Sequence, residues 1–399
     1  MTSGPGTNRT PLPKGFLAGG INSGVRRYRP DLGILLSEKP AVCVGVFTLN
    51  ECKAAPILYS QALLPAKNIR AIITNSGQAN AATGALGVKT NLQMAAAAAK
   101  VIGCKSEQVI TASTGVIGVQ MDIEKIESAT PEMIERANEN AESFALAILT
   151  TDLVPKTVTT TVALAGGNIR ITGISKGSGM IHPNMATMLG YIMTDVELDP
   201  GVAQSLLKEA TDVSFNMISV DGDSSTNDCV YLMANGATGV ALKNDADMKT
   251  FKAALIDISQ FLAKSIARDG EGATKLVQVD IANCSGLELA KKAARGVTLS
   301  PLIKSAIHGE DPNWGRILAR LGSEGVPAAS LNKMNHKLQG VLVFQDGAPA
   351  KFDRPEVRAL LKRELVNIEI DLKSGNANAT AWGCDLSKKY VEINTEYST

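Results

Sequence analysis

The chain has 399 residues, of which 45% are hydrophobic and 20% charged, so it has ample apolar material for a folded core and does not have the composition of a disordered protein. The formal net charge is only +1 and no long basic run is present, which argues against nucleic acid as a partner. No apolar run reaches the ~18 residues that a membrane span needs, and the N-terminus lacks the apolar stretch of a secretory signal. We therefore expect no membrane association and a cytoplasmic location.

Cysteine and histidine are too scattered to indicate a metal site or a disulfide framework. The six cysteines contain no C-x-x-C pair, and the three histidines are isolated from one another. The acidic loop from Asp221 to Asp228 lacks the ligand pattern of an EF-hand, so it is expected to be a hydrogen-bonded loop near a pocket or a plain structural turn. No phosphate-binding loop or dinucleotide fingerprint occurs, and no cofactor is predicted.

The first part of the chain predicts short strands that run into glycine-rich loops. Strands are expected at 34–36, 41–47, 71–74 and 109–112, a helix at 90–102, and helical structure over 122–149. Within that last segment, Thr130 followed by Pro131 predicts a cap and a first-turn proline, and hence two helices in place of one.

The remainder predicts strand pairs separated by helices. A hairpin is expected over 157–174 around the turn at 165–167, and a helix begins at Asp199–Pro200. Further strands are expected at 186–196, 230–234, 239–242, 276–281, 338–344, 367–372 and 378–382, and further helices at 246–267, 287–306 and 355–365. Because this is not a regular βαβ alternation, the predicted fold class is α+β with mixed sheets.

The most informative segment runs from Ser175 to Asp195 and has the sequence SKGSGMIHPNMATMLGYIMTD. In it a glycine-rich loop leads to Ala186 and then Thr187, which opens a second apolar run. A threonine hydroxyl is a weak nucleophile without a base, but cutting the Ala186–Thr187 bond would free an α-amine to act as that base. The reference pKa of such an amine, about 7.7 to 8.0, suits proton transfer near neutral pH. The residues alone also allow a plainer interpretation, in which Thr187 is a buried residue at a strand start.

This segment resembles the self-cleavage region of the ornithine acetyltransferase (glutamate N-acetyltransferase) family of arginine biosynthesis. The resemblance covers roughly residues 15–399 and rests on the order of several short blocks. These include VFTLN at 46–50, NSGQAN at 75–80, STGVIG at 113–118, VDGDSSTND at 220–228, RDGEGATK at 268–275 and GEDPNWGR at 309–316. It implies an α-β-β-α layered core with a smaller second lobe, placed at about 239–338. It also implies self-cleavage into residues 1–186 and 187–399, which would pair into a heterotetramer.

The reaction implied by the resemblance is an acetyl transfer. Thr187 would take the acetyl group of N2-acetyl-L-ornithine as an ester and pass it to L-glutamate, giving L-ornithine and N-acetyl-L-glutamate. Some members of the family also accept acetyl-CoA, so acetyl-CoA is a candidate co-substrate, although no cofactor is implied. A related self-cleaving aminopeptidase or amidohydrolase, in which water takes the acyl group, is the alternative. A non-catalytic amino-acid-binding protein is a third hypothesis, and it predicts no cleavage before Thr187.

The resemblance assigns Thr114 and Gly115 to an oxyanion hole, since their loop follows a strand and a backbone N–H there can point at a reacting oxygen. Without the resemblance, the same residues are a glycine turn at a strand end. Lys176 would lower the pKa of a nearby amine or hold a substrate carboxylate. From the residues alone, Lys176 is equally consistent with a solvated lysine in a glycine loop.

Further substrate contacts are implied nearer the C-terminus and in the middle of the chain. Glu271 would pair with the amino end of ornithine or orient the Thr187 amine, although by itself it fits an exposed acid in the turn after a helix. Thr151 matches a substrate-contacting threonine, and its neighbour Thr150 is the rival for that match. Asn394 and Thr399 match substrate-binding positions in a region that would otherwise be a loose tail.

Overall fold

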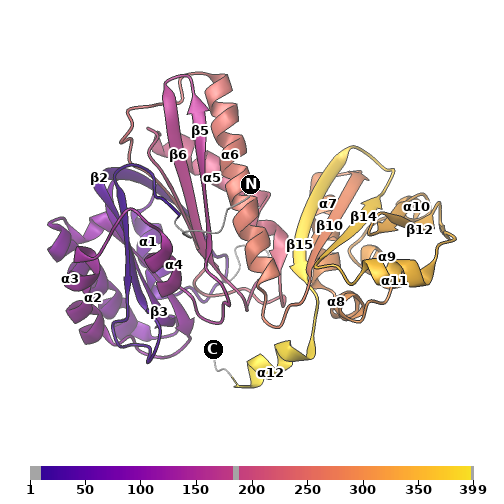
Figure 1. Cartoon of the computed structure of the whole chain (residues 1–399), viewed down its shortest axis with the longest axis horizontal. Helices are drawn as coiled ribbons and strands as arrows, with labels where there is room; N and C mark the ends of the chain where they lie inside the picture. The colour runs from indigo at the N-terminus through magenta and orange to yellow at the C-terminus, as the bar shows by residue number, and fades with distance from the viewer. Residues whose placement is uncertain (1–9, 183–187, 397–399) are drawn as a thin grey trace.

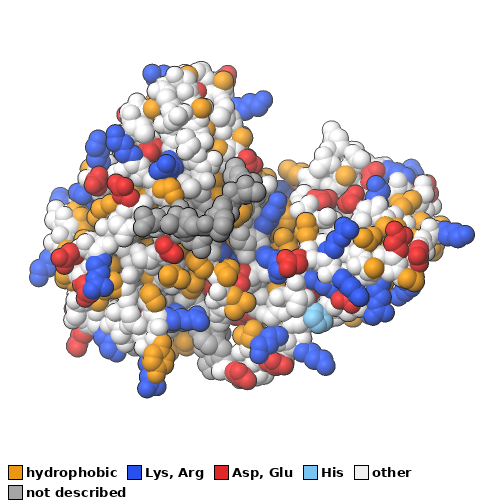
Figure 2. Space-filling model, in the orientation of Figure 1, with side chains coloured by type: hydrophobic (Ala, Val, Ile, Leu, Met, Phe, Trp, Pro, Cys, Tyr) orange, Lys and Arg blue, Asp and Glu red, His pale blue; other side chains and the backbone are white. Residues whose placement is uncertain are grey.

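The structure, a computed structural model of the whole chain, describes residues 10–182 and 188–396. Ala186, Thr187 and Thr399, which belong to the predicted site, lie outside the described residues. Within the described ranges, no helix is long and apolar enough to cross a membrane. On the face shown in Figure 2, Lys and Arg side chains are interspersed with Asp and Glu, as the net charge of +1 leads one to expect.

The first sheet has the hydrogen-bonded order β4-β3-β2-β9-β7-β6-β5, with β1 paired to β2. Its strands are β1 (Phe16–Ile21), β2 (Leu32–Phe47), β3 (Ala66–Gln78), β4 (Val109–Val116), β5 (Lys156–Leu164), β6 (Gly167–Lys176), β7 (Leu189–Thr194) and β9 (Cys229–Ala234). The hairpin predicted around 165–167 is confirmed as β5 and β6. The sheet is mixed, because β3 pairs parallel with β4 and β7 parallel with β9.

Strand β2 folds this sheet into two facing layers (Figure 1). Its first half pairs with β1 and β3, the register shifts after Leu36, and its second half pairs with β9. Between the layers, Leu35 of β2 shares a buried cluster with Tyr191 of β7. The Tyr191 hydroxyl also lies 2.9 Å from Thr74 Oγ1 on β3, which links the layers by a hydrogen bond.

Helices cover the outer faces of both layers, which confirms the predicted α-β-β-α core. On the layer of β1–β4 lie α2 (Gly84–Ile102) and α3 (Ile123–Glu135), packed through a cluster that contains Met94 and Ile73. On the opposite layer lie α5 (Pro200–Asp212) and α6 (Asp245–Arg268). The shorter α1 (Ala55–Leu63) and α4 (Glu142–Ala147) add Ile57 and Phe144 to the cluster between the layers. Short 3₁₀ turns occur at Ser106–Gln108 and Phe215–Met217.

A second mixed sheet forms the smaller lobe, in the order β13-β12-β11-β14-β10-β15-β8 (Figure 1). Its strands are β8 (Ile218–Ser219), β10 (Leu276–Cys284), β11 (Asn335–Leu338), β12 (Val341–Gln345), β13 (Ala348–Pro349), β14 (Leu365–Asp371) and β15 (Ala377–Cys384). Its helices are α7 (Leu287–Leu299), α8 (Pro301–His308), α9 (Trp314–Ser323), α10 (Ala328–Leu331) and α11 (Arg354–Leu360). The division of the chain at residue 186 and the lobe boundaries at 239–338 stay predictions.

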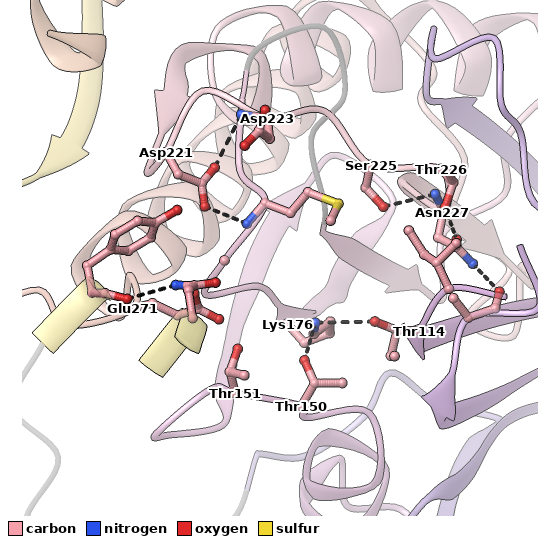
Figure 3. Close-up of a pocket in the computed structure, with 17 residues that line it drawn as sticks. Thr114, Thr150, Thr151, Lys176, Asp221, Asp223, Ser225, Thr226, Asn227 and Glu271 are labelled. Carbon is pink, nitrogen blue, oxygen red and sulfur yellow. Dashed lines mark hydrogen bonds between the residues drawn. The ribbon is translucent and has the colours of Figure 1, made fainter. Parts of the chain in front are cut away.

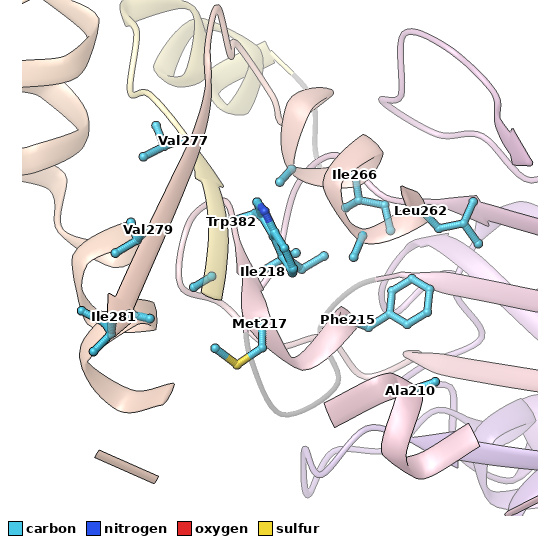
Figure 4. Close-up of a cluster of buried hydrophobic side chains, with 14 of the residues drawn as sticks. Ala210, Phe215, Met217, Ile218, Leu262, Ile266, Val277, Val279, Ile281 and Trp382 are labelled. Atoms are coloured by element: carbon cyan, nitrogen blue, oxygen red, sulfur yellow. The ribbon is translucent and has the colours of Figure 1, made fainter. Parts of the chain in front are cut away.

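The lobe joins the core through apolar packing against α6. Trp382 of β15 lies beside Ile218 and shares a buried cluster with Ile266 and Leu262 of α6 (Figure 4). The ammonium group of Lys264, also on α6, stands 4.9 Å from the centre of the Trp382 ring. Helix α12 (Lys388–Glu396) follows β15 and returns the chain toward the core.

Some local predictions are wrong. The segment 122–149 does form two helices, α3 and α4, but the break between them follows Glu135 and not Thr130. Pro131 lies inside α3, where the Thr130 hydroxyl bonds the Ile126 carbonyl within the helix and does not cap a new one. The segment 338–344 is two strands, β11 and β12, because Gln339 and Gly340 both take positive φ angles and turn the chain.

Other boundaries also differ from the prediction. Residues 239–242 form no strand, and only an isolated bridge joins Ala241 to Glu197. The helix expected over 287–306 divides into α7 and α8, because the Ser300 side chain accepts the Ile303 N–H and starts a second helix. In contrast, 34–36 and 41–47 belong to a single long strand, β2.

Candidate active site

A pocket brings together motifs that are far apart in the sequence (Figure 3). Every predicted site residue that the structure describes lines it: Thr114 and Gly115 of β4, Thr151 in the loop after α4, Lys176 at the end of β6, Glu271 after α6 and Asn394 of α12. The structure therefore places them together, while their roles stay predictions.

Gly115 is required by the close approach of β4 to β3. In this parallel pair Gly115 lies opposite Gly77, with a φ of +132°. A Cβ atom on Gly115 would come within 2.2 Å of the Gly77 carbonyl carbon, so no larger residue fits there. The neighbouring Thr114 also lines the pocket, with its hydroxyl oxygen 3.3 Å from Lys176 Nζ.

Lys176 is a buried lysine that lines the pocket. Its Nζ donates to Thr150 Oγ1 at 2.8 Å and to Thr114 Oγ1 at 3.3 Å, and it lies 3.8 Å from Asp152 Oδ2. Burial lowers the pKa of Lys176 below its ordinary value, although Asp152 opposes that effect. Thr150, the rival of Thr151 in the sequence analysis, thus holds Lys176, and both threonines line the pocket.

The opposite side of the pocket is acidic. Glu271 Oε2 accepts a hydrogen bond of 2.8 Å from Asn394 Nδ2, and Asp221 and Asp223 lie nearby on the pocket wall (Figure 3). Burial, together with the charges of these acids, raises the pKa of Tyr390 above its ordinary value. A pocket with a lysine on one side and carboxyl groups on the other suits a small zwitterion such as an amino acid.

The C-terminal helix is fastened to the pocket by the turn that carries Glu271. Asp385 accepts hydrogen bonds from the backbone N–H and the hydroxyl of Thr274, at 2.8 and 2.6 Å. The Ser387 hydroxyl donates to the Gly272 carbonyl at 2.6 Å. These contacts order the chain that leads to Asn394, so this part of the C-terminal region is not a loose tail.

Sequence analysis did not single out Asn227, which lines the pocket, and its neighbour Asp228 is not among the lining residues. Asp228 is fully buried, its Oδ1 accepts the Met188 N–H at 2.9 Å, and burial raises its pKa well above the ordinary value. Asn227 donates to the carbonyls of Ala79 and Ser113, at 2.6 and 2.9 Å. The loop from 221 to 228 is thus the hydrogen-bonded loop near a pocket that was expected. Their place in the block VDGDSSTND is the sequence feature that could have pointed to these residues.

Comparison with known proteins identifies the family. A family model, described as the ArgJ family, matches residues 17–399. The arginine biosynthesis bifunctional protein ArgJ of Thermotoga neapolitana is 43% identical over 397 residues, which are 97% of this chain and 100% of that protein. The chain belongs to the ArgJ family. The ArgJ protein of Bacillus cereus is likewise 43% identical over 391 residues, covering 97% of this chain and 96% of its own length.

A solved ArgJ structure agrees with the fold. The crystal structure of ArgJ from Bacillus halodurans matches this chain with 39% sequence identity and a TM-score of 0.51. The match covers 100% of that chain and 53% of this one. ArgJ membership confirms the resemblance found in the sequence, and with it the prediction of an enzyme of the glutamate N-acetyltransferase family of arginine biosynthesis.

Proposed function

We propose that this ArgJ chain moves an acetyl group from N2-acetyl-L-ornithine to L-glutamate through an ester on Thr187. The observation that carries the proposal is the pocket itself, in which the Thr114 hydroxyl, the Lys176 ammonium and the Glu271 carboxyl lie together although they come from distant motifs. The curated relatives are named arginine biosynthesis proteins, which supports the same pathway.

Self-cleavage is the first step of the proposal. The Thr187 hydroxyl attacks the Ala186 carbonyl carbon, the C–N bond breaks, and water hydrolyses the resulting ester to a free Ala186 carboxyl group and a free Thr187 amine. The products are residues 1–186 and 187–399. In support, the Bacillus halodurans chain matches in full over 53% of this chain, which is the share that residues 187–399 make up.

In the acetyl-transfer cycle, the Thr187 oxygen bonds the acetyl carbon of acetylornithine. The amide C–N bond breaks, and the leaving nitrogen takes the hydroxyl proton by way of the Thr187 α-amine. The glutamate amine then attacks the ester and regenerates the hydroxyl. Thr114 and Gly115 would stabilise the oxyanion in both steps.

The remaining pocket residues would bind the amino acids. Lys176 would hold a substrate carboxylate and Glu271 the side-chain ammonium of ornithine, since each carries the complementary charge. Thr151, Asn394 and Thr399 would make further contacts, as the resemblance implies. Glutamate and ornithine share their α-amino acid end, so one set of contacts can serve both.

The proposal has three further parts. Acetyl-CoA serves as a second acetyl donor, which the name bifunctional supports for the relatives that bear it. Copies of residues 1–186 and 187–399 assemble as a heterotetramer. The enzyme works in the cytoplasm.

Intact mass spectrometry under denaturing conditions is the first test. Self-cleavage predicts two chains, the second beginning at Thr187, in place of one species of 41.9 kDa. Thr187→Ala should give a single full-length chain without acetyl transfer, whereas the control Thr161→Ala, at an exposed position of β5, should be cleaved normally. Two chains in the Thr187→Ala protein would refute the assignment of the nucleophile.

The acceptor is tested by supplying acetylornithine with isotopically labelled glutamate. Labelled N-acetylglutamate supports the transferase. Release of free acetate at the same rate with and without glutamate would instead indicate the aminopeptidase or amidohydrolase reaction. Adding acetyl-CoA in place of acetylornithine tests the second donor.

A further inference from the structure

A row of buried charges with alternating sign runs behind the pocket. Lys156 Nζ lies 2.6 Å from Asp269 Oδ2 and 2.7 Å from Asp152 Oδ1, and Lys176 Nζ lies 3.8 Å from Asp152 Oδ2. The side chains of Lys156, Asp152 and Lys176 are at most 3% exposed. Buried ion pairs often contribute little to stability compared with apolar residues of the same size, so packing alone does not account for the row.

Asp152 is the ionised partner of Lys176. Burial alone would raise its pKa, but the ammonium groups of Lys176 and Lys156 lower it below the ordinary value. The other acids that face Lys176 are Asp228 and Glu271. Burial raises the pKa of Asp228 well above its ordinary value, and the Glu271 carboxylate bonds Asn394.

Asp152 also holds the loops on both sides of Lys176. Its Oδ2 accepts the Thr150 N–H at 3.1 Å, and its Oδ1 accepts the Gly177 N–H at 2.7 Å. Thr150 in turn accepts a hydrogen bond from Lys176. The position of the Lys176 ammonium is therefore determined by Asp152 directly and through its neighbours.

The far end of the row reaches the turn that carries Glu271. Asp269 Oδ2 accepts the Leu153 N–H at 3.0 Å, and the Asp269 carbonyl accepts the Ser178 hydroxyl at 2.7 Å. The Glu271 N–H donates to the Ser178 carbonyl at 3.0 Å. The same buried row thus contacts both charged sides of the pocket.

We propose that Asp152 is a positioning residue, held by the backbone N–H groups of Thr150 and Gly177, that keeps the Lys176 side chain charged and directed at the Thr114 hydroxyl. The inference deepens the proposed function, since it concerns how Lys176 is made ready to hold a substrate carboxylate. Asp152 itself would not touch the substrate.

The test measures the charge of Lys176 directly. Parent protein and variants are labelled with trace acetic anhydride at a series of pH values, and acetylation of the peptide that contains Lys176 is quantified by mass spectrometry. Only the neutral amine reacts, and Lys176 lines the pocket, where the reagent reaches it. In Asp152→Asn, which keeps the shape and one of the two acceptor oxygens, Lys176 should react roughly tenfold faster at a fixed pH at which most Lys176 side chains are protonated.

Asp247→Asn is the matched control. Asp247 is also buried and also accepts backbone N–H groups, from Ala165 at 2.8 Å and Lys243 at 3.3 Å, but it lies at the start of α6 and does not line the pocket. The labelling of Lys176 should be unchanged in this variant. Unchanged labelling in Asp152→Asn as well would overturn the proposal.

Lys156→Met is a second variant, and it should change the labelling rate of Lys176 in the opposite direction. It removes a positive charge that faces Lys176 and leaves Asp152 in place, so Lys176 should react more slowly than in the parent protein. If Asp152→Asn does not fold, faster or equal labelling in Lys156→Met overturns the proposal.

Acetyl transfer is measured on the same samples. Asp152→Asn should lose activity at a lower pH than the parent on the alkaline side of the profile, because its Lys176 is neutralised sooner. If Lys176 labelling is faster in Asp152→Asn than in the parent protein but the parent transfers no acetyl group, the proposed function is refuted and the positioning role stands. Normal transfer without a labelling shift would refute the positioning role alone.

Discussion

Gly179 packs directly against the carboxyl group of Glu271. A Cβ atom at position 179 would lie 2.4 Å from the carboxyl carbon of Glu271, which is much closer than any van der Waals contact allows. Gly179 belongs to the SKGSGM segment and Glu271 to RDGEGATK, so this contact joins two of the blocks that carry the family resemblance. The acidic side of the pocket is therefore set by the absence of a side chain at position 179.

Gly179→Ala should impair substrate binding more than folding. The added methyl group meets the end of a flexible side chain, so Glu271 can turn away, but it then leaves Asn394 and the pocket. We expect KM for acetylornithine to rise roughly tenfold, which corresponds to a lost charged hydrogen bond of about 1.5 kcal/mol. Steady-state kinetics and thermal unfolding check this.

Gly286→Ala is the control for that substitution. A Cβ atom there meets nothing within 4 Å, and Gly286 does not line the pocket, so kinetics and Tm should match the parent protein. An unchanged KM in Gly179→Ala would show that the contact with Glu271 has no role in binding.

Glu271→Gln should raise KM for acetylornithine by roughly tenfold while leaving the fold intact. Glutamine keeps the oxygen that accepts from Asn394 Nδ2 but lacks the charge that would pair with the ornithine side-chain ammonium. The control is Glu310→Gln, which removes the carboxylate 3.3 Å from Lys275, away from the pocket lining. If Glu271→Gln and Glu310→Gln change KM equally, the Glu271 carboxylate does not bind the ornithine ammonium.

Thr114→Val should lower kcat about 10²-fold, because the hydroxyl is a proposed oxyanion donor and valine keeps the shape of the side chain. Thr111→Val is the matched control on the same strand. The Thr111 hydroxyl is buried and has no hydrogen-bond partner among the described residues, so its removal should leave kcat unchanged. Measuring kcat and the rate of self-cleavage in both variants tests the role of Thr114 as an oxyanion donor. Equal kcat in the two variants would contradict that role.

The smaller lobe should lose stability as the pH falls below about 6.5. His336 on β11 is fully buried, and burial lowers its pKa from 6.5 to about 4. Between these values the unfolded chain binds a proton that the folded protein excludes. The free energy of unfolding should therefore fall by about 2 kcal/mol between pH 7 and pH 5, and level off below the folded pKa.

Urea unfolding at pH 7 and pH 5 measures this loss. His336→Leu should remove most of the pH dependence, because leucine does not titrate. His308→Gln, at a partly exposed histidine of the same lobe, should keep it. The same loss of stability in the His336→Leu protein would rule out His336 as its source.

The sequence by itself determined the family, the residue types of the candidate site and much of the local structure. The residue types that line the pocket are visible as motifs, since Thr114, Gly115, Lys176 and Glu271 all lie in blocks of the family resemblance. The hairpin of β5 and β6 and the long helix α6 follow from local signals, namely glycine turns and periodicity, which depend on neighbours within a few residues. Family membership follows from the same blocks.

Only the tertiary structure decided how these blocks meet. The fold of β2 into two layers depends on pairing with β3 on one side and β9 on the other, which no local propensity encodes. Asp152 and Lys156 look like ordinary loop and strand-end charges in the sequence, yet both are buried and paired. The reason is physical: the charge state and contacts of a side chain depend on what surrounds it in space, and those neighbours come from remote parts of the chain.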